Sequence, residues 1–130
     1  MIYHLGKQIK AGKNPRIFKF GEQKRDHIYV NDAVDATIKA LNAKQSCIVN
    51  VGTGIATTFN DLIKVLNKAL GTDFEPEYFN MPYDPKTYQS NTQADTEKAE
   101  KMLGFKAKWP LKKGIADYFK FLDANGWDNE

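Results

Sequence analysis

Cys47-Ile-Val-Asn-Val51 leads directly into Gly52-Thr-Gly54, and an amphipathic stretch follows over residues 58–70. The first segment is mostly apolar and does not alternate, which favours a strand buried on both faces in a parallel sheet. In the last segment, Thr58 and Asp61 form a capping-box-like start, and apolar residues then recur at helical spacing. This order of strand, turn and helix predicts an α/β fold.

The same kind of pattern extends to both sides of this region. Apolar stripes predict helices over residues 2–11, 32–42, 95–104 and from 110 onward, and β-prone runs predict short strands over 16–20, 27–30 and 74–79. Asp32 is expected to cap the second helix, whose stripe of Val34, Ile38 and Leu41 should face inward. A parallel-type strand at 47–51 needs sheet partners that the sequence does not clearly supply, so we expect them outside the chain.

Length and composition indicate an ordinary globular protein. The 130 residues favour a single domain over 1–130, with 42% hydrophobic and 27% charged residues. No apolar run approaches the roughly 20 residues of a membrane span, and no secretory segment begins the chain. A lone cysteine, Cys47, and two histidines exclude an internal disulfide and argue against a transition-metal cluster. We therefore expect a cytoplasmic protein with no metal and no membrane partner.

Positive charge is concentrated at the start of the chain. Residues 1–25 hold seven basic side chains and one acidic side chain, a net charge of +6, whereas the whole chain carries +3. Such a basic N-terminal segment attracts anionic ligands, which could be phosphate-bearing small molecules, nucleic acid or acidic proteins. A solvated basic face with no ligand explains the same pattern.

Two motifs could carry phosphate chemistry. Arg25 offers a planar fork suited to bidentate phosphate binding, and Asp26 beside it could hold that fork in place. The alternative is a surface ion pair. Gly52-Thr53-Gly54 could present free N–H groups to a phosphate, but it lacks a third glycine and a following lysine. We therefore interpret it as a tight turn between a strand and a helix.

Three segments resemble the extended short-chain dehydrogenases/reductases. Lys24-Arg-Asp-His-Ile-Tyr-Val30, with Asp32 two residues on, resembles their R-D-x-V-Y-V-x-D signature, and Val49-Asn-Val-Gly-Thr-Gly54 before a helix is similar to their next landmark. Tyr88-Gln-Ser-Asn-Thr-Gln-Ala-Asp95 resembles the Y-Q-x-x-T-Q-A-D segment of ADP-L-glycero-D-manno-heptose 6-epimerases. The match runs nearly end to end, onto the last two-fifths or so of a family member.

The resemblance implies the function of a larger enzyme. In that family, NADP bound by an N-terminal Rossmann domain oxidises the ADP-sugar transiently and returns hydride to the opposite face at C6″, which makes a lipopolysaccharide core precursor. This chain would be the C-terminal substrate-binding domain without the Rossmann domain, with no catalytic residue and no cofactor of its own. We therefore expect it to be inactive alone and its parent enzyme to be a homo-oligomer.

The resemblance also implies a set of substrate-binding residues. They are His4, Phe18, Arg25 and Tyr88, together with the loop Lys19, Phe20 and Gly21. Arg25 would contact the diphosphate. The loop departs from the family's Glu-Gly-Ser type and is one residue shorter. Tyr3 and Lys7 have the Tyr-x-x-x-Lys spacing of the catalytic pair, but no cofactor-binding βαβ unit precedes them, so we interpret this spacing as a coincidence.

Two other functions fit the same residues. One is another UDP- or GDP-sugar epimerase or dehydratase of the same superfamily. The other is a non-catalytic module that binds nucleotides or nucleic acid through its basic N-terminal segment, although nucleic acid is the less favoured partner. Nucleic-acid binding would weaken steeply with salt, which would separate the two.

Overall fold

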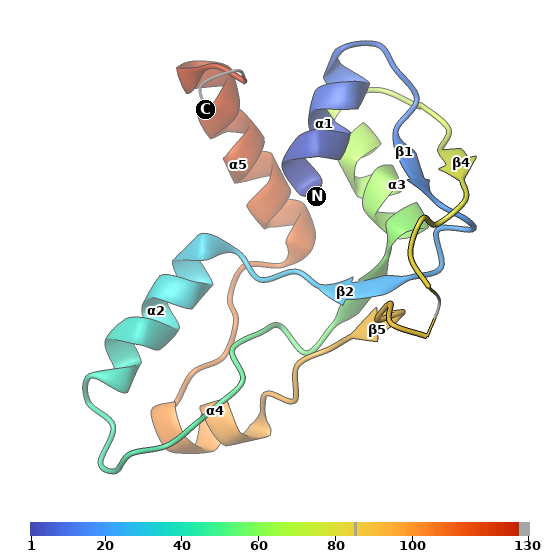
Figure 1. The fold of residues 1–130 in the computed structure, drawn as a ribbon. Helices are drawn as coiled ribbons and strands as arrows, with labels where there is room; N and C mark the ends of the chain where they lie inside the picture. The colour runs from blue at the N-terminus through green and yellow to red at the C-terminus, as the bar shows by residue number, and fades with distance from the viewer. Residues whose placement is uncertain (85, 128–130) are drawn as a thin grey trace. The chain divides into compact units, whose positions relative to one another are not determined.

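The computed structural model describes residues 1–84 and 86–127 and has a mixed α/β fold, which confirms the predicted class. The helices of this part of the chain are α1 (Ile2–Lys10), α2 (Val30–Ala40), α3 (Phe59–Leu70), α4 (Glu97–Leu103) and α5 (Leu111–Asn125) (Figure 1). The strands are β1 (Arg16–Phe18), β2 (Lys24–Asp26), β3 (Ala56–Thr58), β4 (Glu77–Phe79) and β5 (Asn91–Thr92). None of these helices has the length and apolar character needed to cross a membrane.

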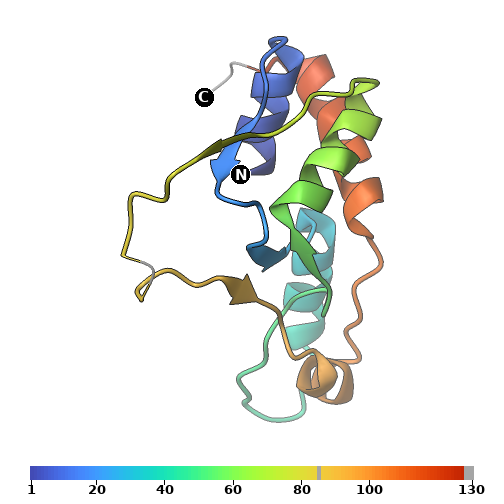
Figure 2. The same cartoon turned by 90° about the vertical axis from the view of Figure 1, so that its right-hand side faces the viewer.

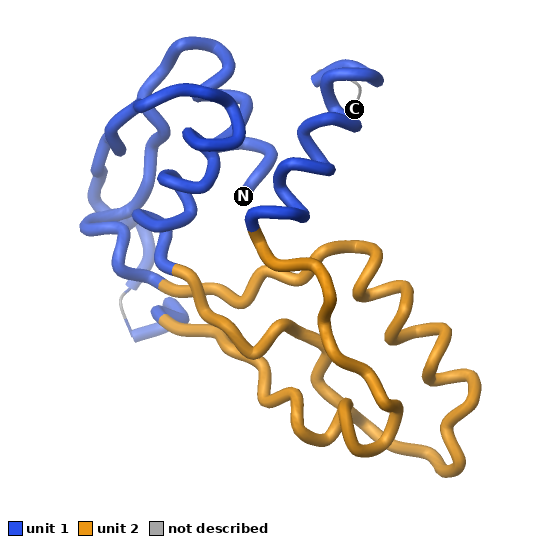
Figure 3. Tube along the Cα trace, turned by 180° about the vertical axis from the view of Figure 1, so that it is seen from behind, with its two compact units in different colours: residues 1–23, 58–90, 112–130 blue, residues 24–57, 91–111 orange. Residues whose placement is uncertain are grey.

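The chain folds into two compact units (Figure 3). The first unit comprises residues 1–23, 58–90 and 112–130, and the second comprises residues 24–57 and 91–111. The chain therefore crosses between the units several times. A single substrate-binding domain over residues 1–130 stays a prediction.

The first unit is built from three helices and a two-stranded sheet. Helices α1, α3 and α5 run side by side (Figure 2), and β1 pairs with β4 in parallel, with Arg16 opposite Glu77 and Phe18 opposite Phe79. The helices bury the apolar stripes that the sequence predicts. With Ile17 of β1, the buried apolar side chains of this unit are Leu5, Ile9, Phe59, Leu62, Ile63, Leu66, Ile115, Phe119 and Leu122.

The predicted start of α3 is confirmed in detail. The Thr58 hydroxyl accepts a hydrogen bond from the Asp61 backbone N–H at 3.0 Å and donates one to the Asp61 carboxylate at 2.8 Å. The helix ends at Leu70, directly before Gly71. Local capping and one continuous apolar stripe thus determine this helix.

The second unit has a small sheet and a small core. Its strand order is β3-β2-β5, and β2 pairs with β5 in parallel, with Lys24 opposite Asn91 and Arg25 opposite Thr92. The core gathers residues from α2, from α4 and from the segments that follow them. Its members are Ala36, Ala99 and Phe105, with Ile28, Val49, Leu103 and Ala107 partly buried around them.

The prediction for residues 27–30 was wrong, and so was the cap at Asp32. The strand is β2 at Lys24–Asp26, and Val30 already belongs to α2, whose N-cap is Tyr29. Asp32 lies in the first turn, is only 2% exposed, and accepts hydrogen bonds from the backbone N–H groups of Lys108 and Trp109, each at 2.9 Å. The carboxylate is buried because it satisfies a distant backbone segment rather than its own helix end.

The predicted inward stripe of α2 is exposed instead. Val34, Ile38 and Leu41 are 50%, 56% and 82% exposed, and the side chain that α2 packs into the core is Ala36. With Val30, which is 60% exposed, these residues form what we call the apolar α2 face. The second unit is small, so it can cover only one narrow side of the helix.

Residues 47–51 form no strand in the structure. Ile48 is 88% exposed, whereas Val49 packs against the small core of the second unit. The prediction of a strand buried on both faces was therefore wrong for this structure. Residues 47–51 are mostly apolar, but within the described part of the chain none of them pairs with a strand of a sheet.

Candidate functional site

The loop after β1 is held by one side chain of α3. The Asn60 amide nitrogen donates to the Phe20 carbonyl at 2.9 Å and to the Glu22 carboxylate at 3.0 Å, and the Asn60 backbone N–H donates to the Gly21 carbonyl at 3.2 Å. The Asn60 carbonyl oxygen accepts a hydrogen bond from the Tyr78 hydroxyl at 3.0 Å. These contacts fix the backbone of the loop and leave the Phe20 ring 68% exposed.

Close packing against Asn60 requires glycine at position 21. Gly21 has φ +76°, and a Cβ there would lie 2.0 Å from the Asn60 side-chain oxygen. Gly12 has nearly the same backbone, with φ +72°, but a Cβ would meet no atom within 4 Å. The two glycines therefore separate backbone strain from side-chain crowding.

We expect Gly21→Ala to lower the free energy of unfolding by about 2 kcal/mol, because strain and crowding add. Gly12→Ala is the matched control and should cost about 1 kcal/mol from backbone strain alone. Urea unfolding of both variants measures the difference. Equal losses would show that the Asn60 contact moves aside at no cost.

Four aromatic rings of the first unit gather beside this loop. Phe18 meets Phe79 edge to face, with 4.9 Å between ring centroids. It also meets Tyr83 at 5.9 Å and Tyr88 at 5.8 Å, with interplanar angles of 85° and 83°. Tyr83 and Tyr88 are parallel to each other, with centroids 6.3 Å apart and an interplanar angle of 2°. The structure thus brings Phe18 and Tyr88 together and adds Tyr83.

His4 lies on the exposed side of α1. Its ring meets Tyr3 edge to face at 5.3 Å. The Tyr3 hydroxyl donates a hydrogen bond to the Trp127 carbonyl, and the Lys7 ammonium lies 5.7 Å from the Tyr3 ring centroid. Tyr3 and Lys7 therefore both have packing roles. This supports the interpretation that their Tyr-x-x-x-Lys spacing is a coincidence.

In the second unit, Asp26 is the acceptor around which the Gly-Thr-Gly turn closes. Its carboxylate accepts hydrogen bonds from the Thr53 hydroxyl at 2.5 Å and from the N–H groups of Thr53 at 2.9 Å, Gly54 at 2.8 Å and Ala94 at 3.2 Å. The N–H groups that could have faced a phosphate therefore face a carboxylate of the chain itself. This geometry supports the interpretation of the turn as structural.

The hydrogen bonds also determine the charge state of Asp26. Burial raises its pKa, but the bonds from Thr53, Ala94 and Gly54 outweigh burial and bring the pKa below its ordinary value. Gly52 makes the close approach possible, since a Cβ there would lie 2.5 Å from the Ala94 Cβ and 2.7 Å from the Asp26 carboxylate. Asp26 is therefore an anion held in place by the Gly-Thr-Gly turn and Ala94.

Arg25 lies beside Asp26 on β2 and is partly buried. One of its guanidinium N–H groups donates to the Lys24 carbonyl at 2.7 Å. Arg25 belongs to the second unit, whereas His4, Phe18, Lys19, Phe20, Gly21 and Tyr88 belong to the first. Each of these substrate-binding residues stays a prediction.

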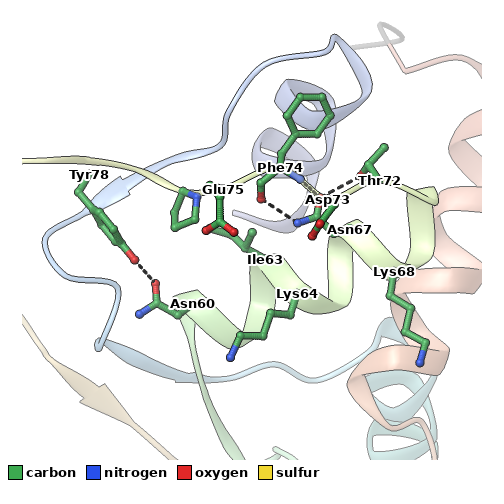
Figure 4. Close-up of a pocket in the computed structure, with 11 residues that line it drawn as sticks. Asn60, Ile63, Lys64, Asn67, Lys68, Thr72, Asp73, Phe74, Glu75 and Tyr78 are labelled. Atoms are coloured by element: carbon green, nitrogen blue, oxygen red, sulfur yellow. Dashed lines mark hydrogen bonds between the residues drawn. The ribbon is translucent and has the colours of Figure 1, made fainter.

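A separate groove of about 480 Å³ lies between α3 and residues 72–78 of the first unit (Figure 4). Lys64 and Lys68 line it together with Asp73 and Glu75, so its charge is mixed. Its buried amide, Asn67, accepts hydrogen bonds from the Thr72 hydroxyl at 2.9 Å and the Phe74 N–H at 3.0 Å, and its amide nitrogen donates to the Phe74 carbonyl at 2.9 Å. The Asn67 amide is therefore held by the chain itself, and nothing about this groove points to a particular ligand.

Sequence reasoning missed three residues of this region. It treated Asp26 only as a partner of Arg25, and it did not single out Asn60 or Tyr83. A turn rich in N–H groups needs a nearby acceptor, and that need was a usable signal for Asp26. Among the residues that the structure describes, no three His, Cys, Asp or Glu side chains gather to hold a metal ion.

Comparison with known proteins identifies the family. The family model described as GDP-mannose 4,6 dehydratase matches residues 1–118. A relative from Methanocaldococcus jannaschii is 36% identical over 121 residues, 93% of this chain and 38% of that protein. The UDP-glucose 4-epimerase of Mycolicibacterium smegmatis is 32% identical over 116 residues, 88% of this chain and 36% of that protein.

Solved structures agree with this result. The ADP-L-glycero-D-manno-heptose-6-epimerase of Helicobacter pylori matches with a TM-score of 0.82 and 32% identity over 95% of this chain and 37% of that one. A mutant UDP-glucuronic acid 4-epimerase from Bacillus cereus, in complex with a fluorinated substrate analogue and NAD, matches with a TM-score of 0.82 and 29% identity over 94% of this chain and 40% of that one. The chain thus spans less than two-fifths of the curated relatives' length. The relatives and solved structures are named for different nucleotide sugars, namely UDP-glucose, UDP-glucuronic acid and ADP-L-glycero-D-manno-heptose.

Proposed function

This chain belongs to the GDP-mannose 4,6-dehydratase family, and we propose that it supplies the nucleotide-sugar-binding surface of an epimerase. The end-to-end match carries the proposal, because 95% of the chain superposes on a nucleotide-sugar epimerase. In our proposal the substrate is ADP-D-glycero-D-manno-heptose and the product its L-glycero epimer. The segment Tyr88–Asp95 supports this choice, because it resembles the corresponding segment of the heptose epimerases.

A UDP-sugar epimerase is the second candidate. The M. smegmatis relative and the B. cereus structure favour it, since both are named for UDP-sugars. Binding of ADP-glucose and UDP-glucose to the chain separates the two candidates. A clear preference for the adenosine compound supports the heptose enzyme, and the reverse preference supports a UDP-sugar enzyme.

The glycine turn of this chain does not fit the pyrophosphate of a dinucleotide. The N–H groups of Thr53 and Gly54 already donate to the Asp26 carboxylate, and a second anion there would be repelled. We therefore assign no step of the reaction to a cofactor on this turn. In our proposal the nicotinamide dinucleotide, NADP, is bound elsewhere in the parent enzyme. A homo-oligomeric parent enzyme in the cytoplasm also stays a prediction.

The proposed binding roles follow from side-chain chemistry. Arg25 carries a permanent charge and a planar fork, so it is proposed to contact the diphosphate. Phe18 and Tyr88 offer aromatic surface to the nucleotide. Asn60 fixes the backbone of the loop 19–21, which we propose to contact the sugar. His4 is proposed to offer a polar ring to the substrate.

We expect Arg25→Lys to weaken the binding of ADP-glucose by about tenfold, because lysine keeps the charge but loses the two-pronged contact. Isothermal titration calorimetry on the 130-residue chain measures this effect. Arg16→Lys is the matched control, since Arg16 is already paired with Glu77 at 3.0 Å and should not contribute. If the two variants bind alike, Arg25 does not contact the diphosphate.

A further inference from the structure

Tyr83 is a large aromatic side chain that the fold holds in place without burying it. Its ring is parallel to that of Tyr88 and nearly perpendicular to that of Phe18, yet the residue is 57% exposed. It belongs to the first unit and follows β4 in the sequence. No sequence motif singled it out.

Core packing does not account for this arrangement. Phe18 already has an apolar partner in Phe79, with 4.9 Å between ring centroids, so it does not depend on Tyr83 for burial. An aromatic side chain that served only to stabilise the fold would gain more from being covered, since burial of apolar area is the main stabilising contribution. The exposed, oriented ring of Tyr83 suits a planar ligand instead.

The geometry suits the base of a nucleotide. Two edge contacts to Phe18 hold Tyr83 and Tyr88 parallel, so little side-chain freedom remains to be lost when a ligand binds. Aromatic rings stack on the π-face of any base, and each such contact contributes about 1–3 kcal/mol. Stacking alone is tolerant of the base, so adenine and uracil would both be accepted.

We propose that Tyr83, together with Tyr88 and oriented by Phe18, forms a stacking platform for the base of the nucleotide sugar. The inference rests on the proposed function and adds Tyr83 as a binding residue. The platform binds the base, whereas Arg25 is assigned to the diphosphate. The two contributions are therefore separable by ligands that lack one part.

Calorimetry with ADP, UDP and inorganic pyrophosphate on the 130-residue chain tests the platform. Tyr83→Ala should weaken ADP and UDP by about 10- to 100-fold and leave pyrophosphate unchanged, because only the stacked base loses its partner. Tyr83→Phe should retain binding within about threefold, since the π-face is kept. Phe121→Ala removes another exposed aromatic side chain of the first unit, 59% exposed on α5, and should change nothing.

Saturation-transfer NMR gives a second readout that does not depend on affinity alone. Base protons of ADP should receive saturation from the aromatic resonances of the wild type, and Tyr83→Ala should reduce it. Circular dichroism checks that each variant is folded.

The outcomes separate the two proposals. If Tyr83→Ala leaves ADP binding unchanged while Arg25→Lys weakens it, the platform is wrong and the proposed function stands. If the wild-type chain binds neither the nucleotides nor pyrophosphate, both are overturned. If Tyr83→Ala also weakens pyrophosphate, the ring stabilises the site generally and does not stack on a base.

Discussion

Asp26→Ala is expected to lower the stability of the second unit by about 3 kcal/mol, because it removes a charged acceptor from several donors at once. The N–H groups of Thr53, Gly54 and Ala94 would lose their acceptor, and the Thr53 hydroxyl would lose its shorter hydrogen bond. Amide hydrogen exchange at these three N–H groups measures the loss locally and does not require the two units to unfold together.

Asp35→Ala is the matched control in the same unit. Asp35 forms an i,i+4 ion pair with Lys39 at 2.6 Å on the surface of α2, and removing such a pair changes stability little. Its exchange pattern around Thr53 and Ala94 should be that of the wild type. Equal effects of the two substitutions would mean that the Asp26 carboxylate does not stabilise the Gly-Thr-Gly turn and Ala94.

The stability contribution of Asp26 should also depend on pH, which provides a second test. Its pKa is lowered in the folded chain, so its contribution is fully present above the unfolded value of about 3.9 and is lost as the pH falls through the folded value. The stability difference between wild type and Asp26→Ala should therefore be constant from pH 7 to pH 5 and shrink below about pH 4. A difference that persists unchanged into strong acid would contradict an ionised acceptor.

The apolar α2 face is expected to make the chain self-associate. Val30, Val34, Ile38 and Leu41 are between 50% and 82% exposed along one side of the helix, with Ile48 at 88% nearby in the sequence of the same unit. Burying each such side chain fully contributes about 1.5–3 kcal/mol, so joining two copies through this face is favourable. Light scattering should show a mean mass that rises with concentration.

Ile38→Lys with Leu41→Lys should return the chain to a monomer. Ala69→Lys with Ala124→Lys adds the same charge at exposed positions of α3 and α5 and should leave the association unchanged. A wild-type chain that stays monomeric over a wide concentration range would contradict the expectation. Association that both double variants abolish would show a response to net charge and not to this face.

Much of the first unit could be predicted from the sequence because its signals are local. The cap formed by Thr58 and Asp61 and the apolar stripe that follows it describe α3 almost residue by residue. The same holds for α1 and for the inward face of α5, where Ile115 and Phe119 are buried as predicted. Residue spacing and capping chemistry determine such elements wherever enough apolar surface is at hand.

The second unit was less predictable because side chains far apart in the sequence decide it. Asp32 looks like a helix cap but serves the backbone of Lys108 and Trp109, 76 and 77 residues away. The strand forms at Lys24–Asp26 and not at the β-prone run 27–30. It pairs with Asn91 and Thr92, and no local sequence pattern predicts this pairing. Propensity gives way here to hydrogen bonds that only the tertiary fold can bring together.

For the candidate site, the sequence predicted Phe18, Arg25 and Tyr88 through their resemblance to family residues, and it determined the presence of a tight turn at Gly52-Thr53-Gly54. The tertiary structure alone decided that Asp26 fills that turn and that Tyr83 lies parallel to Tyr88. The physical reason is the same in both cases. Motifs record which chemical groups are available, whereas the acceptor or ring that each group meets depends on long-range packing.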